Sequence, residues 1–231
     1  MNLIFIQGNP ACRAKKYMEN LQKEAVQVQL LFVNACMRGP ELSRTHAPCR
    51  AFMTAAREEA PGLTILEHDL TRMNLRPIDA DTLPFKEALA DERDWEAPLL
   101  HPALEFAQSD AVLIGAPYWD LSFPSTLKIW VEHMYVRNLT FRYEDGKPIG
   151  LAQGKKAYYL STAGSPIGEN DWGAGYMKAV LNLLGIPEFT SIRAEGIDID
   201  GWDKEKILRE AEQKSVEAGR SLGRWAKSVN E

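Results

Sequence analysis

Short apolar segments alternate with helical ones along this chain, and this alternation is the feature that most limits its possible folds. The strand-like segments are short and apolar or β-branched, as strands buried on both faces of a parallel sheet are. They span residues 28–34, 64–69, 111–116, 156–162 and 189–195. Helical spacing is found at residues 43–59, 95–108, 125–135, 172–184 and 203–229. We therefore predict an α/β fold, a doubly wound five-stranded parallel sheet with helices on both faces.

Right-handed crossovers restrict the order of these strands. The most economical topology is the order 2-1-3-4-5, which is the flavodoxin-like order. Ligands of such sheets bind beyond the carboxyl ends of the strands, where the order reverses between the first and third strands. Three loops meet there, at residues 35–45, 117–123 and 161–168. We expect one binding site between these loops.

The size and charge of the chain restrict its domain organisation and its partners. Its 231 residues, 45% of them hydrophobic, are enough for one substantial core. We expect a single domain over residues 27–231, preceded by an extension over residues 1–26. This extension is a flexible arm, a dimer-wrapping arm, or sequence upstream of a true start at Met18. The formal net charge of −5 argues against a nucleic-acid partner.

The cysteines and apolar runs indicate a reducing, aqueous compartment. Cys12, Cys36 and Cys49 cannot all pair, and none has the spacing of a metal-binding motif. No apolar run approaches about 18 residues, and the early basic residues follow the first apolar run, whereas a secretory signal has them before it. We therefore expect a cytoplasmic protein with no metal and no membrane segment.

The loop after the first strand has the features of a phosphate site. It carries Arg38, Ser43, Arg44 and Thr45 and leads directly into a helix. The helix N-terminus offers free N–H groups and partial positive charge, the hydroxyls add donors, and either arginine neutralises an anion. Alternatively, Ser43 is only a helix cap. Cys36, at the strand end, is included among the candidate cofactor contacts, although a buried thiol there is more often a packed residue than a nucleophile.

The chain lacks the two common nucleotide signatures. Neither Gly-x-x-x-x-Gly-Lys-Ser/Thr nor Gly-x-Gly-x-x-Gly occurs, which argues against a P-loop NTPase and a Rossmann dehydrogenase. No Gly-x-Ser-x-Gly elbow occurs either, so the hypothesis of a flavin-free hydrolase on a similar sheet is weak. Instead, the third strand ends in a short aromatic loop that can present backbone N–H groups to a planar heterocycle such as a flavin. The loop residues are Pro117, Tyr118, Trp119, Asp120 and Leu121.

Three motifs give the chain a family resemblance between residues 28 and 196. They are Pro117-Tyr118-Trp119-Asp120, Leu127-Lys128-Ile129-Trp130, and Thr140-Phe141-Arg142-Tyr143 followed by Gly150-Leu151. In these motifs the chain resembles the FMN-dependent NAD(P)H azoreductase and quinone reductase family, which has a flavodoxin-like fold. The resemblance implies that Ser43 and Thr45 hold the FMN phosphate, because a Ser-x-Ser/Thr motif does so in the family.

The resemblance also implies contacts to the flavin ring. A second loop would meet the ring edge where negative charge gathers on reduction, and its backbone N–H groups would stabilise that charge. Its residues are Ser161, Thr162, Ala163, Gly164 and Ser165. Asp120 departs from the Asn common in azoreductases, and an ionised carboxylate beside the ring would disfavour the anionic reduced flavin. Trp119, Phe141 and Tyr143 are the candidate substrate-pocket residues, the last two over the flavin of their own or a partner subunit.

The function implied by this resemblance is a homodimeric FMN-dependent NAD(P)H oxidoreductase acting on quinone, azo or nitro acceptors by a ping-pong mechanism. The cofactor carries the hydride chemistry, so no catalytic side chain is assigned. FMN is preferred to FAD because the phosphate loop suits a terminal phosphate, whereas NADH and NADPH are not distinguished. The alternative is a flavodoxin-like FMN electron carrier that is reduced by a partner protein.

Overall fold

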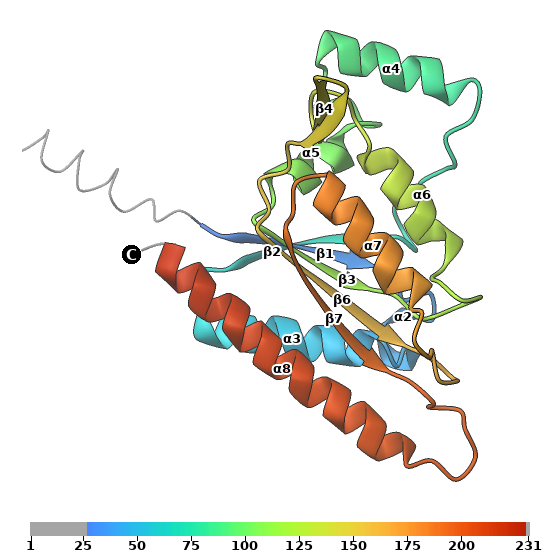
Figure 1. The fold of residues 1–231 in the computed structure, drawn as a ribbon. Helices are drawn as coiled ribbons and strands as arrows, with labels where there is room; N and C mark the ends of the chain where they lie inside the picture. The colour runs from blue at the N-terminus through green and yellow to red at the C-terminus, as the bar shows by residue number, and fades with distance from the viewer. Residues whose placement is uncertain (1–26, 230–231) are drawn as a thin grey trace, which may run out of the picture.

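The computed structural model describes residues 27–229 and contains a central five-stranded parallel sheet (Figure 1). Its strands are β1 (Gln29–Asn34), β2 (Thr64–Asp69), β3 (Ala111–Gly115), β6 (Lys156–Thr162) and β7 (Glu188–Ala194). They lie in the order β2-β1-β3-β6-β7, which is the order 2-1-3-4-5 for the strands of this sheet. The predicted flavodoxin-like fold is therefore confirmed. The predicted extension, residues 1–26, lies outside the described residues, and the domain division stays a prediction.

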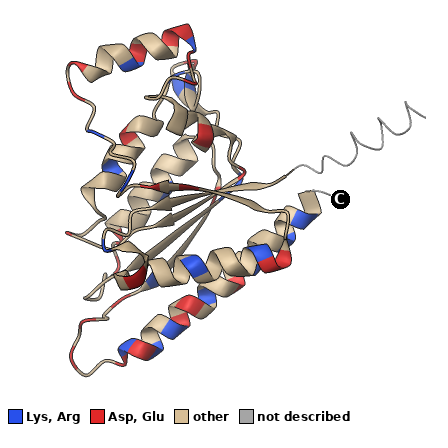
Figure 2. Cartoon of the chain, turned by 180° about the vertical axis from the view of Figure 1, so that it is seen from behind, with Lys and Arg blue, Asp and Glu red and all other residues tan. Residues whose placement is uncertain are grey.

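Two layers of helices cover the sheet. The helices α3 (His46–Glu59) and α8 (Lys204–Val229) pack against each other on one face. The other face is covered by α5 (His101–Gln108), α6 (Ser125–Met134) and α7 (Trp172–Leu183). Acidic and basic side chains alternate along α8 (Figure 2), while its buried stripe consists mostly of small residues. The three central strands β1, β3 and β6 are thus shielded, so a ligand can reach them at the loops that follow the strand ends.

Two features of the fold differ from the sequence expectation. An additional helix, α4 (Thr82–Glu92), lies between β2 and α5. It buries Leu89 and Ala90 but exposes Phe85, so its apolar periodicity is weak. The predicted loop at residues 138–150 contains a hairpin of β4 (Phe141–Glu144) and β5 (Lys147–Gly150), and its turn residues Asp145 and Gly146 both have positive φ.

Two predicted helices begin later than expected. The helix predicted over residues 43–59 begins at His46, and residues 39–42 form the separate short helix α2 (Gly39–Leu42). The helix predicted over residues 95–108 begins at His101, after a run of turns. Pro98 and Pro102 explain this late start, because proline is compatible with the first helical turn but not with the helix interior.

His68 on β2 couples folding stability to pH. It is buried, its Nδ1 accepts a hydrogen bond from Trp130 Nε1 at 3.0 Å, and its Nε2 lies 2.9 Å from Glu105 Oε2. The Trp130 bond requires a neutral Nδ1, and burial lowers the pKa of His68 despite Glu105. The unfolded chain therefore binds the proton first, and stability falls as pH drops below about 6.5 until the folded pKa is passed.

We expect this loss to have a slope of at most about 1.4 kcal/mol per pH unit for one proton. Urea unfolding of the wild type and of His68→Asn between pH 7.5 and 5 measures it. The variant is needed because burial also lowers the pKa of His46. Parallel pH dependences of the two proteins would show that His68 does not contribute.

Candidate cofactor site

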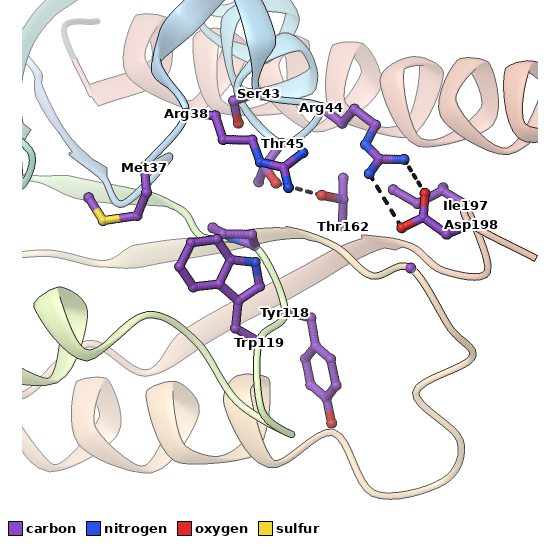
Figure 3. Close-up of a pocket in the computed structure, with 12 residues that line it drawn as sticks. Met37, Arg38, Ser43, Arg44, Thr45, Tyr118, Trp119, Thr162, Ile197 and Asp198 are labelled. Atoms are coloured by element: carbon purple, nitrogen blue, oxygen red, sulfur yellow. Dashed lines mark hydrogen bonds and ion pairs between the residues drawn. The ribbon is translucent and has the colours of Figure 1, made fainter.

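The carboxyl ends of the strands surround a cavity of about 260 Å³ (Figure 3). The three predicted loops all contribute to it, together with a fourth loop after β7 that sequence reasoning did not include. The lining residues are Met37, Arg38, Ser43, Arg44, Thr45, Pro117, Tyr118, Trp119, Thr162, Gly164, Ile197 and Asp198. Nine of these twelve were among the predicted site residues, and Met37, Ile197 and Asp198 were missed.

The two hydroxyl groups of the phosphate loop, those of Ser43 and Thr45, have different hydrogen-bond partners. Ser43 Oγ accepts a hydrogen bond from the backbone N–H of His46 at 3.2 Å, so it does cap the start of α3, and the Ser43 hydroxyl also interacts with the Cys36 thiol. Thr45 is buried, and its Oγ1 lies 2.6 Å from Thr162 Oγ1. This bond joins the loop after β1 to the end of β6. The backbone N–H groups of Arg44 and Thr45 have no hydrogen-bond partner within residues 27–229.

The two arginines of the loop differ in their partners. Arg44 makes an ion pair with Asp198, with a distance of 2.7 Å between Nη1 and Oδ1. The hydrogen bonds from Arg44 hold the pKa of Asp198 below its ordinary value, so that carboxylate is charged at neutral pH. Arg38 has neither an ion pair nor a hydrogen bond with any described residue. Among residues 27–229, the cavity therefore contains one cation without an ion-pair partner, Arg38, and one cation that Asp198 neutralises, Arg44.

The aromatic loop is anchored by its backbone. Tyr118 N–H donates to the carbonyl of Thr162 at 2.9 Å. Trp119 and Ser122 exchange two backbone hydrogen bonds around a turn in which both central residues have positive φ. In Figure 3 the Trp119 ring extends toward Met37 and Arg38, whereas Tyr118 points the opposite way. Trp119 is 41% exposed, so one large aromatic surface remains free to contact a ligand.

Asp120 and Leu121 occupy that turn and do not line the cavity. Their φ angles are 51° and 66°, and a leucine in this region is strained. Their backbone N–H groups have no partner within the described part of the chain. The Asp120 and Leu121 side chains therefore form no part of the cavity lining, while their main-chain donors are left without a partner among the described residues.

The loop after β6 contributes only part of its predicted set. Thr162 and Gly164 line the cavity, whereas Ser161 and Ala163 are buried and Ser165 is exposed away from it. Gly164 is needed for a close approach, because an added Cβ would lie 2.6 Å from Asp198 Oδ2. The buried Ser161 Oγ has no hydrogen-bond partner in the structure.

Three predicted contacts fall elsewhere within one chain. Cys36 does not line the cavity; its thiol is buried, donates to the carbonyl of Gly115 at 3.6 Å, and has its pKa raised to about 11 by burial. Phe141 packs against Tyr135 and Tyr143 and lines a separate cavity beside α4. Tyr143 is exposed. A substrate-pocket role for Phe141 and Tyr143 stays a prediction that requires a second subunit.

Two of the three missed residues follow β7, the last strand along the chain. Ile197 and Asp198 belong to the loop after β7, which ends at the same edge as the other parallel strands. Gly196, with a φ of 79°, turns the chain there, and Asp198 N–H donates to the carbonyl of Gly164 at 2.9 Å. The glycine after the strand, followed by an acidic residue, was the signal that could have indicated this fourth loop.

Comparisons with known proteins agree with this architecture. A family model described as "Flavodoxin-like fold" matches residues 29–218. The FMN-dependent NADH:quinone oxidoreductase 2 of Clostridium acetobutylicum is 30% identical over 199 residues, which are 84% of this chain and 99% of that protein. The corresponding oxidoreductase of Clostridium beijerinckii matches with the same identity and coverage.

A solved structure has the same fold. It is an FMN-dependent NADH-azoreductase from Bacillus anthracis in complex with FMN, with a TM-score of 0.75 and 22% identity over 85% of this chain and 99% of that one. The chain belongs to the flavodoxin-like family, as the resemblance in its motifs indicated. None of the helices among residues 27–229 has the length and apolar character needed to cross a bilayer.

Proposed function

We propose that this protein is an FMN-dependent oxidoreductase that uses NADH or NADPH to reduce quinone or azo compounds. The observation that carries the proposal is the cavity itself, where a free guanidinium, a serine hydroxyl and unpaired backbone N–H groups meet beside an exposed tryptophan. This donor set fits a molecule with an anionic end and a planar end. Relatives that are named FMN-dependent NADH:quinone oxidoreductases support the choice of FMN.

Different residues of the cavity would hold the phosphate and the ring of FMN. Ser43, Arg38 and the unpaired N–H groups of Arg44 and Thr45 would hold the phosphate at the N-terminus of α3. The free N–H groups of Asp120 and Leu121 would meet the ring edge, and the loop that contributes Thr162 and Gly164 to the cavity would meet the other side. When bound, FMN supplies the hydride-transfer chemistry. The chain's own contribution is to bind the cofactor, orient it and leave one face accessible.

Steady-state kinetics test the function and its alternative. With NADH and a quinone as varied substrates, a ping-pong mechanism predicts parallel lines in double-reciprocal plots, because both use the same face in turn. The same assay with azo and nitro acceptors tests the wider acceptor range. The alternative is an electron carrier, and it predicts NADH oxidation only after a separate reductase is added.

A homodimer in the cytoplasm completes the proposal. Support for the dimer comes from Phe141 and Tyr143, which the family resemblance places over a flavin but which do not line the cavity of their own chain. Support for a reducing compartment comes from Cys36 and Cys49, which are both free thiols. Light scattering of the purified protein measures the oligomeric state.

Trp119 is expected to affect turnover more than folding. It lines the cavity and is half-exposed, so Trp119→Ala should change the unfolding free energy by less than about 1 kcal/mol. Loss of the aromatic surface should lower kcat/KM roughly tenfold, the equivalent of one aromatic contact. Trp119→Phe keeps a flat ring and should restore most of the activity. A Trp119→Ala protein that fails to fold would instead show that this ring is part of the core.

A further inference from the structure

The ion pair between Arg44 and Asp198 forms part of the cavity wall. It joins positions 154 residues apart, and the guanidinium contacts both carboxylate oxygens, at 2.7 and 3.4 Å. Figure 3 shows the two side chains pointing toward each other beside Thr162. Arg44 lies between Ser43 and Thr45, the two hydroxyl residues of the phosphate loop. The carboxylate of Asp198 is thus paired with the Arg44 guanidinium, in the loop where the ligand phosphate is expected to bind.

The surroundings of Asp198 keep its carboxylate at this place. Its oxygen lies so close to Gly164 that an added Cβ would be 2.6 Å away, and its N–H is tied to the Gly164 carbonyl. Arg38 and Lys204 are the other charged groups that act on Asp198, and both are cations. No acidic side chain other than Asp198 lines the cavity in the described structure.

The pair is weak enough to exchange. The side chains of Arg44 and Asp198 are 30% and 59% exposed, and exposed ion pairs contribute little because water screens them. A phosphate monoester carries more charge than a carboxylate, and it would gain Ser43, Arg38 and backbone N–H donors at the same time. Arg44 therefore has a better partner when such a ligand enters.

We propose that Asp198 is a specificity-determining residue that competes with the ligand phosphate for Arg44, and so limits how strongly the site prefers FMN to unphosphorylated riboflavin. This inference rests on the proposed function only in taking FMN as the ligand. Before the ligand binds, Asp198 holds the Arg44 side chain in place. When the ligand binds, Arg44 exchanges Asp198 for the phosphate as its ion-pair partner. Removal of the carboxylate should therefore strengthen binding of the phosphorylated flavin alone.

Titration of the cofactor-free protein tests this inference through flavin fluorescence. Asp198→Asn should lower the FMN dissociation constant about two- to fivefold, the range of one exposed ion pair, and leave that of riboflavin unchanged. Asp200→Asn removes the same charge from an exposed position of the same loop and should change neither value. Weaker binding of both flavins by Asp198→Asn would overturn the inference and show that the pair is a clamp for the loops.

A double-mutant cycle tests whether Asp198 acts through Arg44. On an Arg44→Gln background, Asp198→Asn should no longer change FMN affinity. An undiminished effect there would mean general electrostatic repulsion and would contradict the proposed competition.

Inorganic phosphate provides a readout that does not depend on flavin. Added phosphate should raise the Tm of Asp198→Asn more than that of the wild type. Equal shifts would contradict the competition. If the wild type binds no flavin, the proposed function fails while the phosphate comparison still decides this inference.

Discussion

Gly219→Ala is expected to destabilise the protein by about 3 kcal/mol, the upper end of the range for overpacking. Gly219 lies on α8 where this helix crosses α3, and an added Cβ would lie 2.2 Å from the backbone oxygen of Phe52. A backbone atom cannot rotate away as a side-chain end can, so the two helices must separate. Because α3 also begins at the phosphate loop, the separation should reach the cofactor site.

Urea unfolding measures this effect, and Gly175→Ala is the matched control. Gly175 is an exposed helical glycine of α7, and an added Cβ there meets no atom within 4 Å. That change should stabilise the protein by about 0.5–1 kcal/mol, because alanine loses less backbone entropy on folding. Similar unfolding free energies for the two variants would show that α3 and α8 are not in close contact at Gly219.

Arg38→Gln is expected to weaken FMN binding about 10- to 100-fold, which corresponds to the loss of a charge-assisted hydrogen bond. Arg38 is the cation of the cavity that has no partner within residues 27–229, so its charge is free for the phosphate. Riboflavin lacks the phosphate and should bind the variant and the wild type equally. Fluorescence titration with both flavins measures the difference.

Arg57→Gln is the control for net charge. Arg57 is exposed in the last turn of α3, far along the helix from the phosphate loop. Its replacement should leave FMN affinity within about twofold, since exposed charges are screened over about 10 Å. If Arg38→Gln weakened riboflavin as much as FMN, Arg38 would not be a phosphate ligand, and the anionic end of the cofactor would have to lie elsewhere.

The centre of the sheet was predictable from the sequence because β1, β3 and β6 are buried on both faces and are largely apolar. The parts that were missed have weaker patterns. The helix α4 exposes Phe85 and buries the Lys86 side chain, whose amine donates to the carbonyl of Glu132 at 2.6 Å, so its polarity is reversed from the usual one. The hairpin had a signal in Asp145-Gly146, a dipeptide that favours the observed turn.

The site was predictable at the level of its loops and for nine of its twelve lining residues, but not for the remaining three. Topology alone brings the ends of β1, β3 and β6 together, so Arg38, Ser43 and Trp119 were found by position. The direction of a side chain depends on local backbone geometry. Asp120 and Leu121, which both have positive φ, do not line the cavity, and nothing in their residue types predicts this. Asp198 was missed because its ion pair joins segments far apart in the sequence.

The central claim is that this cavity holds FMN for reduction by a nicotinamide. The most direct test is the visible absorption spectrum of the purified protein, loaded with FMN and then titrated with NADH or NADPH without oxygen. Flavin absorption should co-elute with the protein and bleach with about one equivalent of one nicotinamide. Arg38→Gln should retain much less flavin after gel filtration. A wild-type protein that retains no flavin, or retains flavin that neither nicotinamide bleaches, would contradict the account.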